Sequence, residues 1–130
     1  MELEAADGSV YRVDDTFTAL YFNATQHFGK GKRAAPYAKA DNGLMEVYGL
    51  RGNTSRGSLL AILQQLPSGA HHNHPEAAYW QARRCTVKFS GPGCFNVDGE
   101  VMRHDGTITM AVRKQQLPVF AQRDSYAMNA

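Results

Sequence analysis

The sequence has little excess charge and few cysteines. Its 130 residues carry a formal net charge of +2, so the total predicts no general affinity for nucleic acid or for acidic membranes. The charge is uneven, because Lys30, Lys32, Arg33 and Lys39 fall within ten residues. The two cysteines, Cys85 and Cys94, flank a predicted turn. They could face each other across a hairpin, but free thiols are the favoured interpretation because no secretion signal is present.

Long hydrophobic runs are also missing. No stretch approaches the roughly 20 apolar residues that are needed to span a bilayer. The N-terminus has neither the basic nor the apolar region of a signal peptide. We therefore expect a cytoplasmic chain, and we leave peripheral contact with a membrane surface open.

The common catalytic fingerprints are absent. The sequence contains no Walker A loop, no Gly-x-Ser-x-Gly nucleophile turn, no dinucleotide-binding glycine motif and no recognisable Cys/His pairing. A catalytic apparatus that works by itself is therefore not predicted for this chain.

What the sequence does contain is typical of β-structure. Asp-Gly or Asn-Gly turn dipeptides alternate with runs of β-branched and aromatic residues. Within residues 107–113, Ile108, Met110 and Val112 share one face of an extended segment, which predicts a sheet with one buried face. The predicted strands are residues 10–13, 16–23, 44–50, 78–90, 94–97, 107–113 and 117–121.

One segment has helical periodicity instead. After an N-cap at Thr54 or Ser55, four apolar residues recur at helical spacing, and Pro67 ends the run. These four residues are Leu59, Ile62, Leu63 and Leu66. Many short strands with one amphipathic helix predict an all-β domain, either a β-sandwich or a distorted barrel. The domain is expected to cover residues 1–121, and residues 122–130 are expected to form a flexible tail.

A glycine-rich basic segment comprises Gly29, Lys30, Gly31 and Lys32. It lacks the spacing of a Walker A loop, and no helix follows it directly. A loop with free backbone N–H groups and lysines can still bind an anionic group such as phosphate. A solvated turn that simply carries charge is the alternative, and the sequence does not decide between the two.

Three histidines, His71, His72 and His74, raise the question of a metal site. In an extended segment only His72 and His74 would share a face, and two such ligands make a poor zinc motif. A polar loop between helix and strand is the favoured interpretation.

Asp98-Gly99-Glu100 places two carboxylates two residues apart. Asp-Gly is first of all a turn dipeptide, so an ordinary exposed turn is one interpretation. In an extended segment, however, residues 98 and 100 would point to the same side and could reach one cleft. Gly99 would then leave room for a ligand or a partner domain.

Taken in order, these segments resemble the C-terminal domain of the diacylglycerol kinase, sphingosine kinase and ceramide kinase superfamily. The resemblance implies a β-sandwich that forms the lipid-facing half of a two-domain kinase. The Gly-Gly-Asp-Gly-Thr motif of that family's nucleotide-binding domain is absent from this sequence. The matching stretches are residues 23–43, residues 44–51 with the following helix, Gly69-Ala70-His71, His74-Pro75, Asp98-Gly99-Glu100 and Leu117-Pro118.

The resemblance also implies roles for individual residues. Glu100 would be the general base that accepts the proton of a lipid hydroxyl, and Asp98 would orient that hydroxyl or interact with magnesium. The Gly29–Lys32 segment would contact phosphate or a membrane surface. Its lysines interrupt what is commonly a glycine triplet in the family.

A structural magnesium site is a further implication of the resemblance. The matching positions are Lys39, Asn42 and Leu44, partly through backbone carbonyl groups. Asn42 stands where the family usually has aspartate, and a neutral amide is a weaker ligand for a hard cation. The neighbouring Asp41 is an alternative ligand.

The resulting hypothesis is a domain that supplies the lipid-acceptor site and the catalytic carboxylates of an ATP-dependent lipid kinase. It needs ATP, Mg²⁺, a lipid substrate and an N-terminal nucleotide-binding domain or subunit, so the isolated chain should be inactive, and no nucleic acid partner is expected. The main alternative is a non-catalytic lipid-binding or regulatory module derived from such a kinase. A plain β-sandwich interaction domain is a third interpretation, and it would place Asp98 and Glu100 in an exposed turn.

Overall fold

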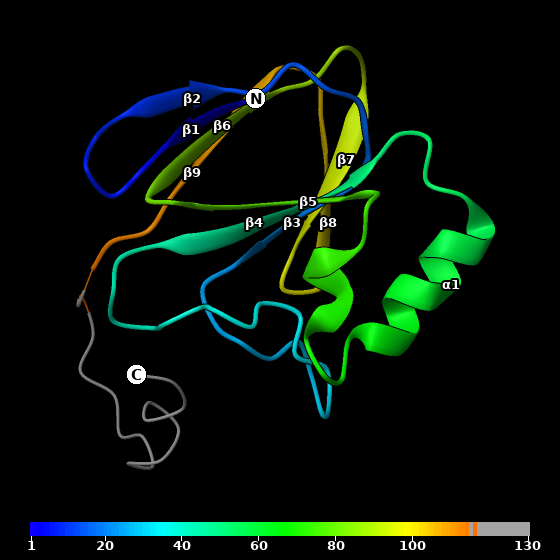
Figure 1. Ribbon diagram of the computed structural model, residues 1–130. Helices are drawn as coiled ribbons and strands as arrows, with labels where there is room; N and C mark the ends of the chain where they lie inside the picture. Colours follow the sequence, from blue (N-terminus) through cyan, green and yellow to red (C-terminus); the bar gives the residue numbers. More distant parts are fainter. Residues whose placement is uncertain (115, 117–130) are drawn as a thin grey trace.

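The computed structural model describes residues 1–114 and residue 116, and it is mostly β-structure with one α-helix (Figure 1). Its nine strands form three antiparallel sheets of four, three and two strands. The all-β prediction with one helix is therefore confirmed. The strand predicted at residues 117–121 and the tail predicted at residues 122–130 lie outside the described residues.

The four-stranded sheet has the order β2-β1-β6-β9. It joins β1 (Glu2–Glu4) and β2 (Val10–Arg12) at the N-terminus to β6 (Arg84–Lys88) and β9 (Thr107–Ala111). In β9, the residues Ile108 and Met110 are partly buried and their neighbours are exposed, which confirms the predicted alternation. The strand β1 was not predicted, although its Leu3 is only 1% exposed.

The three-stranded sheet places β4 (Met45–Arg51) between β3 (Phe17–Asn23) and β5 (Ala77–Ala82). Every residue of β4 except Arg51 is buried, so this strand is covered on both faces. Gly49 is required within it, because a Cβ atom at this position would lie 2.7 Å from the ring of Phe17.

A hydrophobic core joins these two sheets. One face of β4 and β5 packs against β1 and β6, and partly buried side chains such as Trp80 and Phe22 surround the contact. Full burial of a Val, Leu or Met side chain is worth about 1.5–3 kcal/mol each, so this contact holds the two layers together. The buried members are Leu3, Met45, Val47, Ala82 and Cys85.

The chain passes from one sheet to the other at Arg83. The backbone N–H of Arg83 donates to the carbonyl of Glu4, and the carbonyl of Arg83 accepts from the N–H of Val112. The side chains of Arg83 and Arg84 both bind the Glu4 carboxylate. The prediction of a single strand at residues 78–90 is therefore wrong, because the chain leaves one ladder and enters another at this point.

The helix α1 (Arg56–Gln65) begins as predicted, because the hydroxyl oxygen of its N-cap Ser55 accepts from the N–H of Ser58 at 3.0 Å. Only Ile62 of its apolar stripe is buried, and it packs on Tyr48 and Leu50 of β4. The short 3₁₀-helix η1 (Ala70–Asn73) follows. Among the described residues, no helix is long and apolar enough to cross a membrane.

The two-stranded sheet is a hairpin of β7 (Gly93–Val97) and β8 (Glu100–His104). It pairs with neither of the larger sheets in the described part of the chain. The two cysteines therefore lie in different sheets, because Cys85 is in β6 and Cys94 is in β7. Both are free thiols, as favoured from the sequence, and burial raises the pKa of the Cys85 thiol to about 11.

Two ionisable side chains, Glu46 and His71, are buried to 1% exposure. The Nε2 atom of His71 lies 3.0 Å from the carbonyl oxygen of Ala34. Because a carbonyl only accepts, Nε2 carries the proton, and Nδ1 finds no partner among the described residues. Burial lowers the pKa of His71 and raises the pKa of Glu46.

Acid should destabilise the domain through His71. In the unfolded chain a histidine takes up its proton near pH 6.5, whereas the folded His71 does so only at lower pH. The stability that its neutral form contributes is therefore complete above pH 6.5 and falls as the pH decreases toward the folded pKa. NMR titration of the imidazole ring checks this prediction, and a His71 pKa at or above 6.5 would contradict it.

The substitution Glu46→Gln should stabilise the domain at pH 8. The folded carboxyl loses its proton at higher pH than the unfolded one, so stability is lost as the pH rises through the folded pKa. An amide has the same shape and cannot ionise, and the gain should be on the order of 1 kcal/mol. Urea unfolding should show this gain shrinking toward zero at about pH 4.5; a gain that is independent of pH would refute the prediction.

Candidate functional site

Asp98 and Gly99 form the two-residue turn that joins β7 and β8. Val97 is paired with Glu100 in the ladder, so only these two residues lie between the strands. Asp98 has a φ of 49° and Gly99 a φ of 101°, and positive φ at both central residues is the mark of a type I′ turn. The side chain of Asn96 supports the turn by accepting from the N–H of Gly99 at 2.9 Å.

The geometric argument that paired Asp98 with Glu100 is therefore wrong. Residue 98 is in a left-handed conformation and not in an extended strand, so side-chain alternation does not apply across the pair. Both carboxylates are exposed, and neither has a hydrogen bond or ion pair within the described part of the chain. An ordinary turn would expose the two carboxylates in the same way. A cleft that encloses them would therefore have to be completed by another domain or subunit.

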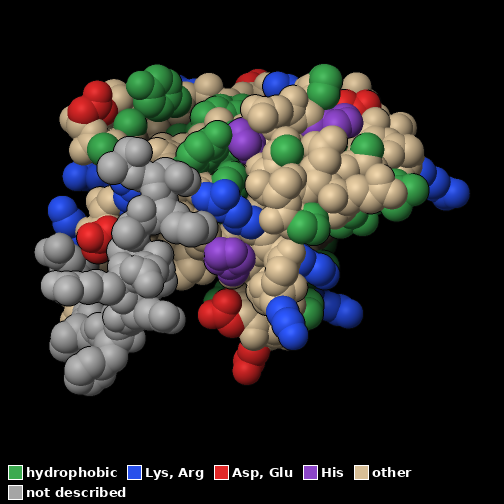
Figure 2. Space-filling model, turned by 60° about the horizontal axis from the view of Figure 1, so that its bottom comes forward, with side chains coloured by type: hydrophobic (Ala, Val, Ile, Leu, Met, Phe, Trp, Pro, Cys, Tyr) green, Lys and Arg blue, Asp and Glu red, His purple; other side chains and the backbone are tan. Residues whose placement is uncertain are grey.

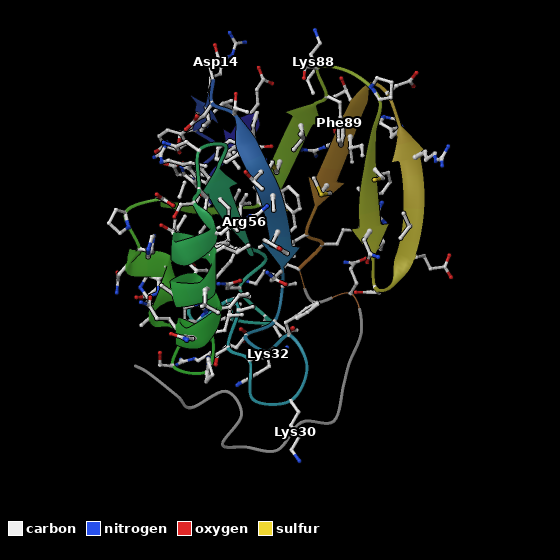
Figure 3. The ribbon with its side chains drawn as sticks, turned by 90° about the vertical axis from the view of Figure 1, so that its right-hand side faces the viewer. Asp14, Lys30, Lys32, Arg56, Lys88 and Phe89 are labelled. Atoms are coloured by element: carbon white, nitrogen blue, oxygen red, sulfur yellow. The ribbon has the colours of Figure 1, made fainter. Side chains whose placement is uncertain are left out.

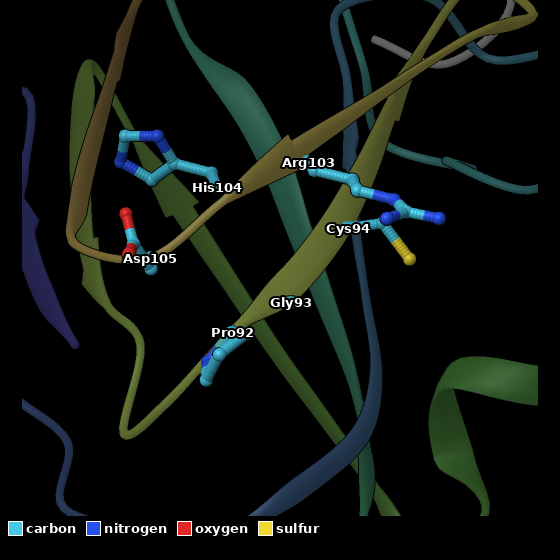
Figure 4. Close-up of a pocket in the computed structure, with 6 residues that line it drawn as sticks. All are labelled: Pro92, Gly93, Cys94, Arg103, His104 and Asp105. Carbon is cyan, nitrogen blue, oxygen red and sulfur yellow. The ribbon is translucent and has the colours of Figure 1, made fainter.

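An open hollow of about 500 Å³ lies at the other end of the same hairpin (Figure 4). Asp105 and the neighbouring His104 line one side, and Cys94 faces Arg103 across the ladder on the other. Because Asp98 and Glu100 are at the opposite end of the strands, this hollow is not the predicted carboxylate site.

The glycine-rich basic segment forms a narrow exposed turn. The N–H of Phe28 donates to the carbonyl of Lys32 at 2.9 Å, and Gly29 and Gly31 have φ values of 73° and 71°. Only glycine adopts this conformation freely. Lys30 lies at the tip of the turn, and Lys32 lies where the chain returns toward the domain (Figure 3). Both lysines are exposed, so they are free to meet an anion.

The turns that carry the predicted carboxylates and the basic residues extend in the same direction. Figures 1 and 3 both show the β7–β8 turn at the lower end of its hairpin and the segment between β3 and β4 projecting farther down. The turn at Asp105-Gly106 lies at the opposite end of the hairpin. Both predicted sets of residues are therefore at turns on the side of the domain away from Asp105.

The predicted magnesium positions form a tight turn. The carbonyl of Lys39 accepts from the N–H of Asn42 at 3.4 Å, and the side-chain oxygen of Asn42 accepts from the N–H of Leu44 at 2.9 Å. The set contains no carboxylate, the Lys39 carbonyl and the Asn42 side-chain oxygen already accept hydrogen bonds, and Asp41 is exposed beside it. Mg²⁺ is usually held through carboxylates, so these residues fit that ion poorly.

The three histidines contact three different partners. His71 bonds Ala34, the Nε2 of His72 lies 2.8 Å from the hydroxyl of Tyr37, and the Nδ1 of His74 accepts from the N–H of Glu76. Among residues 1–114 and 116, no group of three His, Cys, Asp or Glu side chains could hold a metal. His71 and His72 instead connect η1 to the segment that follows the basic turn, and His74 supports the chain just after η1.

A buried carboxyl at Glu46 was missed by the sequence argument. Its oxygens find no hydrogen-bond partner among the described residues, although the Tyr79 hydroxyl, the Gln81 amide and the Tyr37 N–H lie near enough to lower its pKa against the effect of burial. One signal was available, because Glu46 is the only charged residue in the apolar run from residue 44 to residue 50. If such a run is a central strand covered on both faces, its one charged residue must be buried too.

Two comparisons with known proteins show what this chain is similar to. Residues 5–121 match the model of the family described as YegS C-terminal NAD kinase beta sandwich-like domain. Human sphingosine kinase 2 is 28% identical over 95 residues, which are 71% of this chain and 14% of that protein. The chain therefore spans a small part of that relative's length. The match over most of its residues shows that the chain belongs to the YegS C-terminal β-sandwich-like domain family, the C-terminal domain of a lipid kinase family.

Proposed function

We propose that this domain supplies the lipid-acceptor site and the catalytic carboxylates of an ATP-dependent lipid kinase. Family membership carries the general part of the proposal, because complete kinases of this family use ATP and pair the C-terminal domain with a catalytic partner domain. The observation that supports the specific part is that the turns carrying Asp98, Glu100 and Gly29–Lys32 extend in the same direction from the sheets.

The chemistry divides between these groups. Glu100 accepts the proton of the lipid hydroxyl as its oxygen bonds to the γ-phosphorus of ATP, and ADP leaves with the electron pair of the broken P–O bond. Asp98, in the turn that precedes Glu100, orients the lipid hydroxyl for this transfer. Lys30, Lys32 and the N–H groups of the glycine turn offset negative charge on the phosphates. The partner domain supplies the nucleotide and the opposite wall of the cleft.

One observation, which a plain β-sandwich interaction domain would also give, favours a second candidate, a non-catalytic lipid-binding or regulatory module. Asp98 and Glu100 are exposed in an ordinary turn, and neither has a hydrogen bond or ion pair within the described residues. Such a module would not need the carboxylates. The two candidates predict different effects of substituting Glu100: the catalytic role predicts a loss of turnover, and the regulatory module predicts none.

The isolated 130-residue chain should show no ATP-dependent phosphorylation of any lipid. The carboxylates alone cannot bind or orient a nucleotide, and positioning supplies most of the catalysis in phosphoryl transfer. A radiolabelled-ATP assay with diacylglycerol, sphingosine and ceramide in mixed micelles checks this expectation. Phosphorylated product that increases with chain concentration would contradict it.

When the domain is joined to a nucleotide-binding domain of the same family, Glu100→Ala should lower turnover by about 10²–10⁴-fold, the usual contribution of a general base. Asp98→Asn should lower it less, because the amide keeps the shape of the turn. Asp105→Asn is the matched control, since it lies in another Asp-Gly turn at the opposite end of the same hairpin. Normal turnover in Glu100→Ala would reject the catalytic role and favour the regulatory module.

A further inference from the structure

The chain has one asparagine that is followed directly by glycine, at Asn42-Gly43. Because glycine has no side chain, its backbone nitrogen can approach the amide carbon of the preceding asparagine without a steric clash. The asparagine can then lose its amide group as ammonia and become a carboxylate. The other five asparagines precede Ala, Thr, His or Val, whose side chains hinder this approach. Asn42 is therefore the asparagine at which this reaction should be fastest.

The backbone nitrogen of Gly43 is free to act as the nucleophile. Its N–H donates to no acceptor among the described residues, whereas the N–H groups on either side are both used. The N–H of Asn42 donates to the carbonyl of Lys39, and the N–H of Leu44 donates to the side chain of Asn42. Gly43 is also partly exposed, so water reaches the turn. No hydrogen bond within the described residues thus has to break before this nitrogen can react.

The side chain of Asn42 is bent back over the peptide group that would attack it. Its Oδ1 atom accepts from the N–H of Leu44 at 2.9 Å, two residues farther along the chain. When the nitrogen of Gly43 adds to Cγ, negative charge develops on this Oδ1 atom. A donor that already points at the atom where charge develops stabilises the transition state without rearrangement. The N–H of Leu44 therefore both orients the side chain and favours the reaction. Figure 2 shows Lys and Arg side chains on the face that looks out from the bottom of Figure 1.

The fold favours glycine at position 43 and places a cation beside it. Gly43 has a φ of 77°, and a Cβ atom on it would lie 3.1 Å from the Cβ atom of Lys114. A residue with a side chain would be strained there, so the turn retains the Asn-Gly pair. The Cδ atom of Lys114 lies 3.5 Å from the same point, so its ammonium group is close to the turn. A nearby cation favours the negative charge that forms on Asn42.

We propose that Asn42-Gly43 is a self-modification site, at which the folded chain converts Asn42 to isoaspartate and aspartate without an enzyme. The nitrogen of Gly43 bonds to Cγ of Asn42, which closes a succinimide ring, and it gives up its proton. Ammonia leaves with that proton and with the electron pair of the broken Cγ–Nδ2 bond. Water then opens the ring: its oxygen enters the new carboxyl group and its hydrogen returns to the nitrogen of Gly43.

The two products differ in their backbone. Opening of the ring at Cγ restores the ordinary peptide bond and leaves aspartate, whose carboxylate can still accept from the N–H of Leu44. Opening at the backbone carbonyl leaves isoaspartate, in which the chain runs through Cβ and is longer by one carbon atom. The buried strand β4 begins at Met45, just after this turn. The isoaspartate form should therefore lead into the central strand less well, and both products add a negative charge.

Peptide mapping of the folded chain during incubation at physiological temperature and pH tests the proposal. The peptide with Asn42 should gain the mass difference between NH₂ and OH, and an isoaspartate methyltransferase should label it. Conversion should be at least as fast in the folded chain as in the chain unfolded by guanidinium chloride, because the Leu44 donor and Lys114 act only in the fold. The exposed Asn53 and Asn96 are internal controls and should remain unchanged. A folded rate below the unfolded rate, or equal conversion at Asn96, would overturn the proposal.

Single variants test which groups promote the reaction. Asn42→Gln should abolish conversion, because the longer side chain would have to close a larger ring, and Asn53→Gln is the matched control that should leave the rate unchanged. Leu44→Pro removes the N–H donor and should slow conversion at least about ten-fold. Lys114→Gln, at an exposed position, should slow it less. Unchanged rates in both Leu44→Pro and Lys114→Gln would show that the fold does not promote the reaction.

Unfolding of the separated products tests the consequence for the fold. Ion exchange resolves the incubated chain by its added charge. The isoaspartate form should unfold at a lower concentration of guanidinium chloride than the unmodified chain. Asn42→Asp copies the other product and should unfold at nearly the same concentration as the unmodified chain. Equal midpoints for the isoaspartate form and the unmodified chain would refute the effect on β4.

Discussion

Burial of β4 on both faces is the constraint on which the rest of this structure depends. One face of the strand, with Met45 and Val47, closes the core against the four-stranded sheet, and the other, with Tyr48 and Leu50, receives α1. The ladder of β4 also sets where the segment after β3 begins and ends, because Asn23 and Glu46 are paired in it. The basic turn and the Asn42-Gly43 turn therefore leave and rejoin the fold at neighbouring points.

Local signals predicted the elements that depend on local interactions. The N-cap of α1 at Ser55 and the turn at Asp98-Gly99 are each specified by one or two side chains. By contrast, the three-residue strand β1 gains its order from pairing with β2 and β6, and the break at Arg83 depends on Glu4, which is far away in sequence. Such long-range contacts leave little trace in a short stretch of residues.

The candidate site also combines features that the local sequence predicts with features that depend on the fold. The residue types at positions 98 and 100 and in the basic turn were recognisable from the sequence, and so was the order in which they occur. The relation between the two carboxylates was not, because it was argued from the periodicity of an extended strand, whereas Asp98 has the left-handed φ of the Asp-Gly turn. Glu46 was overlooked because a charged residue in an apolar run looks like an exposed position until both neighbouring strands are known.

The separation of the β7–β8 hairpin from both larger sheets has an evolutionary consequence. Among the described residues it shares no ladder with another strand, so its length can change without shifting the register of the sandwich. One residue added to each strand would carry the turn about 3.3 Å farther out and would reverse the faces of the side chains beyond the insertion. Insertions in pairs would preserve those faces. The reach of the two carboxylates can thus vary among relatives in steps of about two residues while the core remains unchanged.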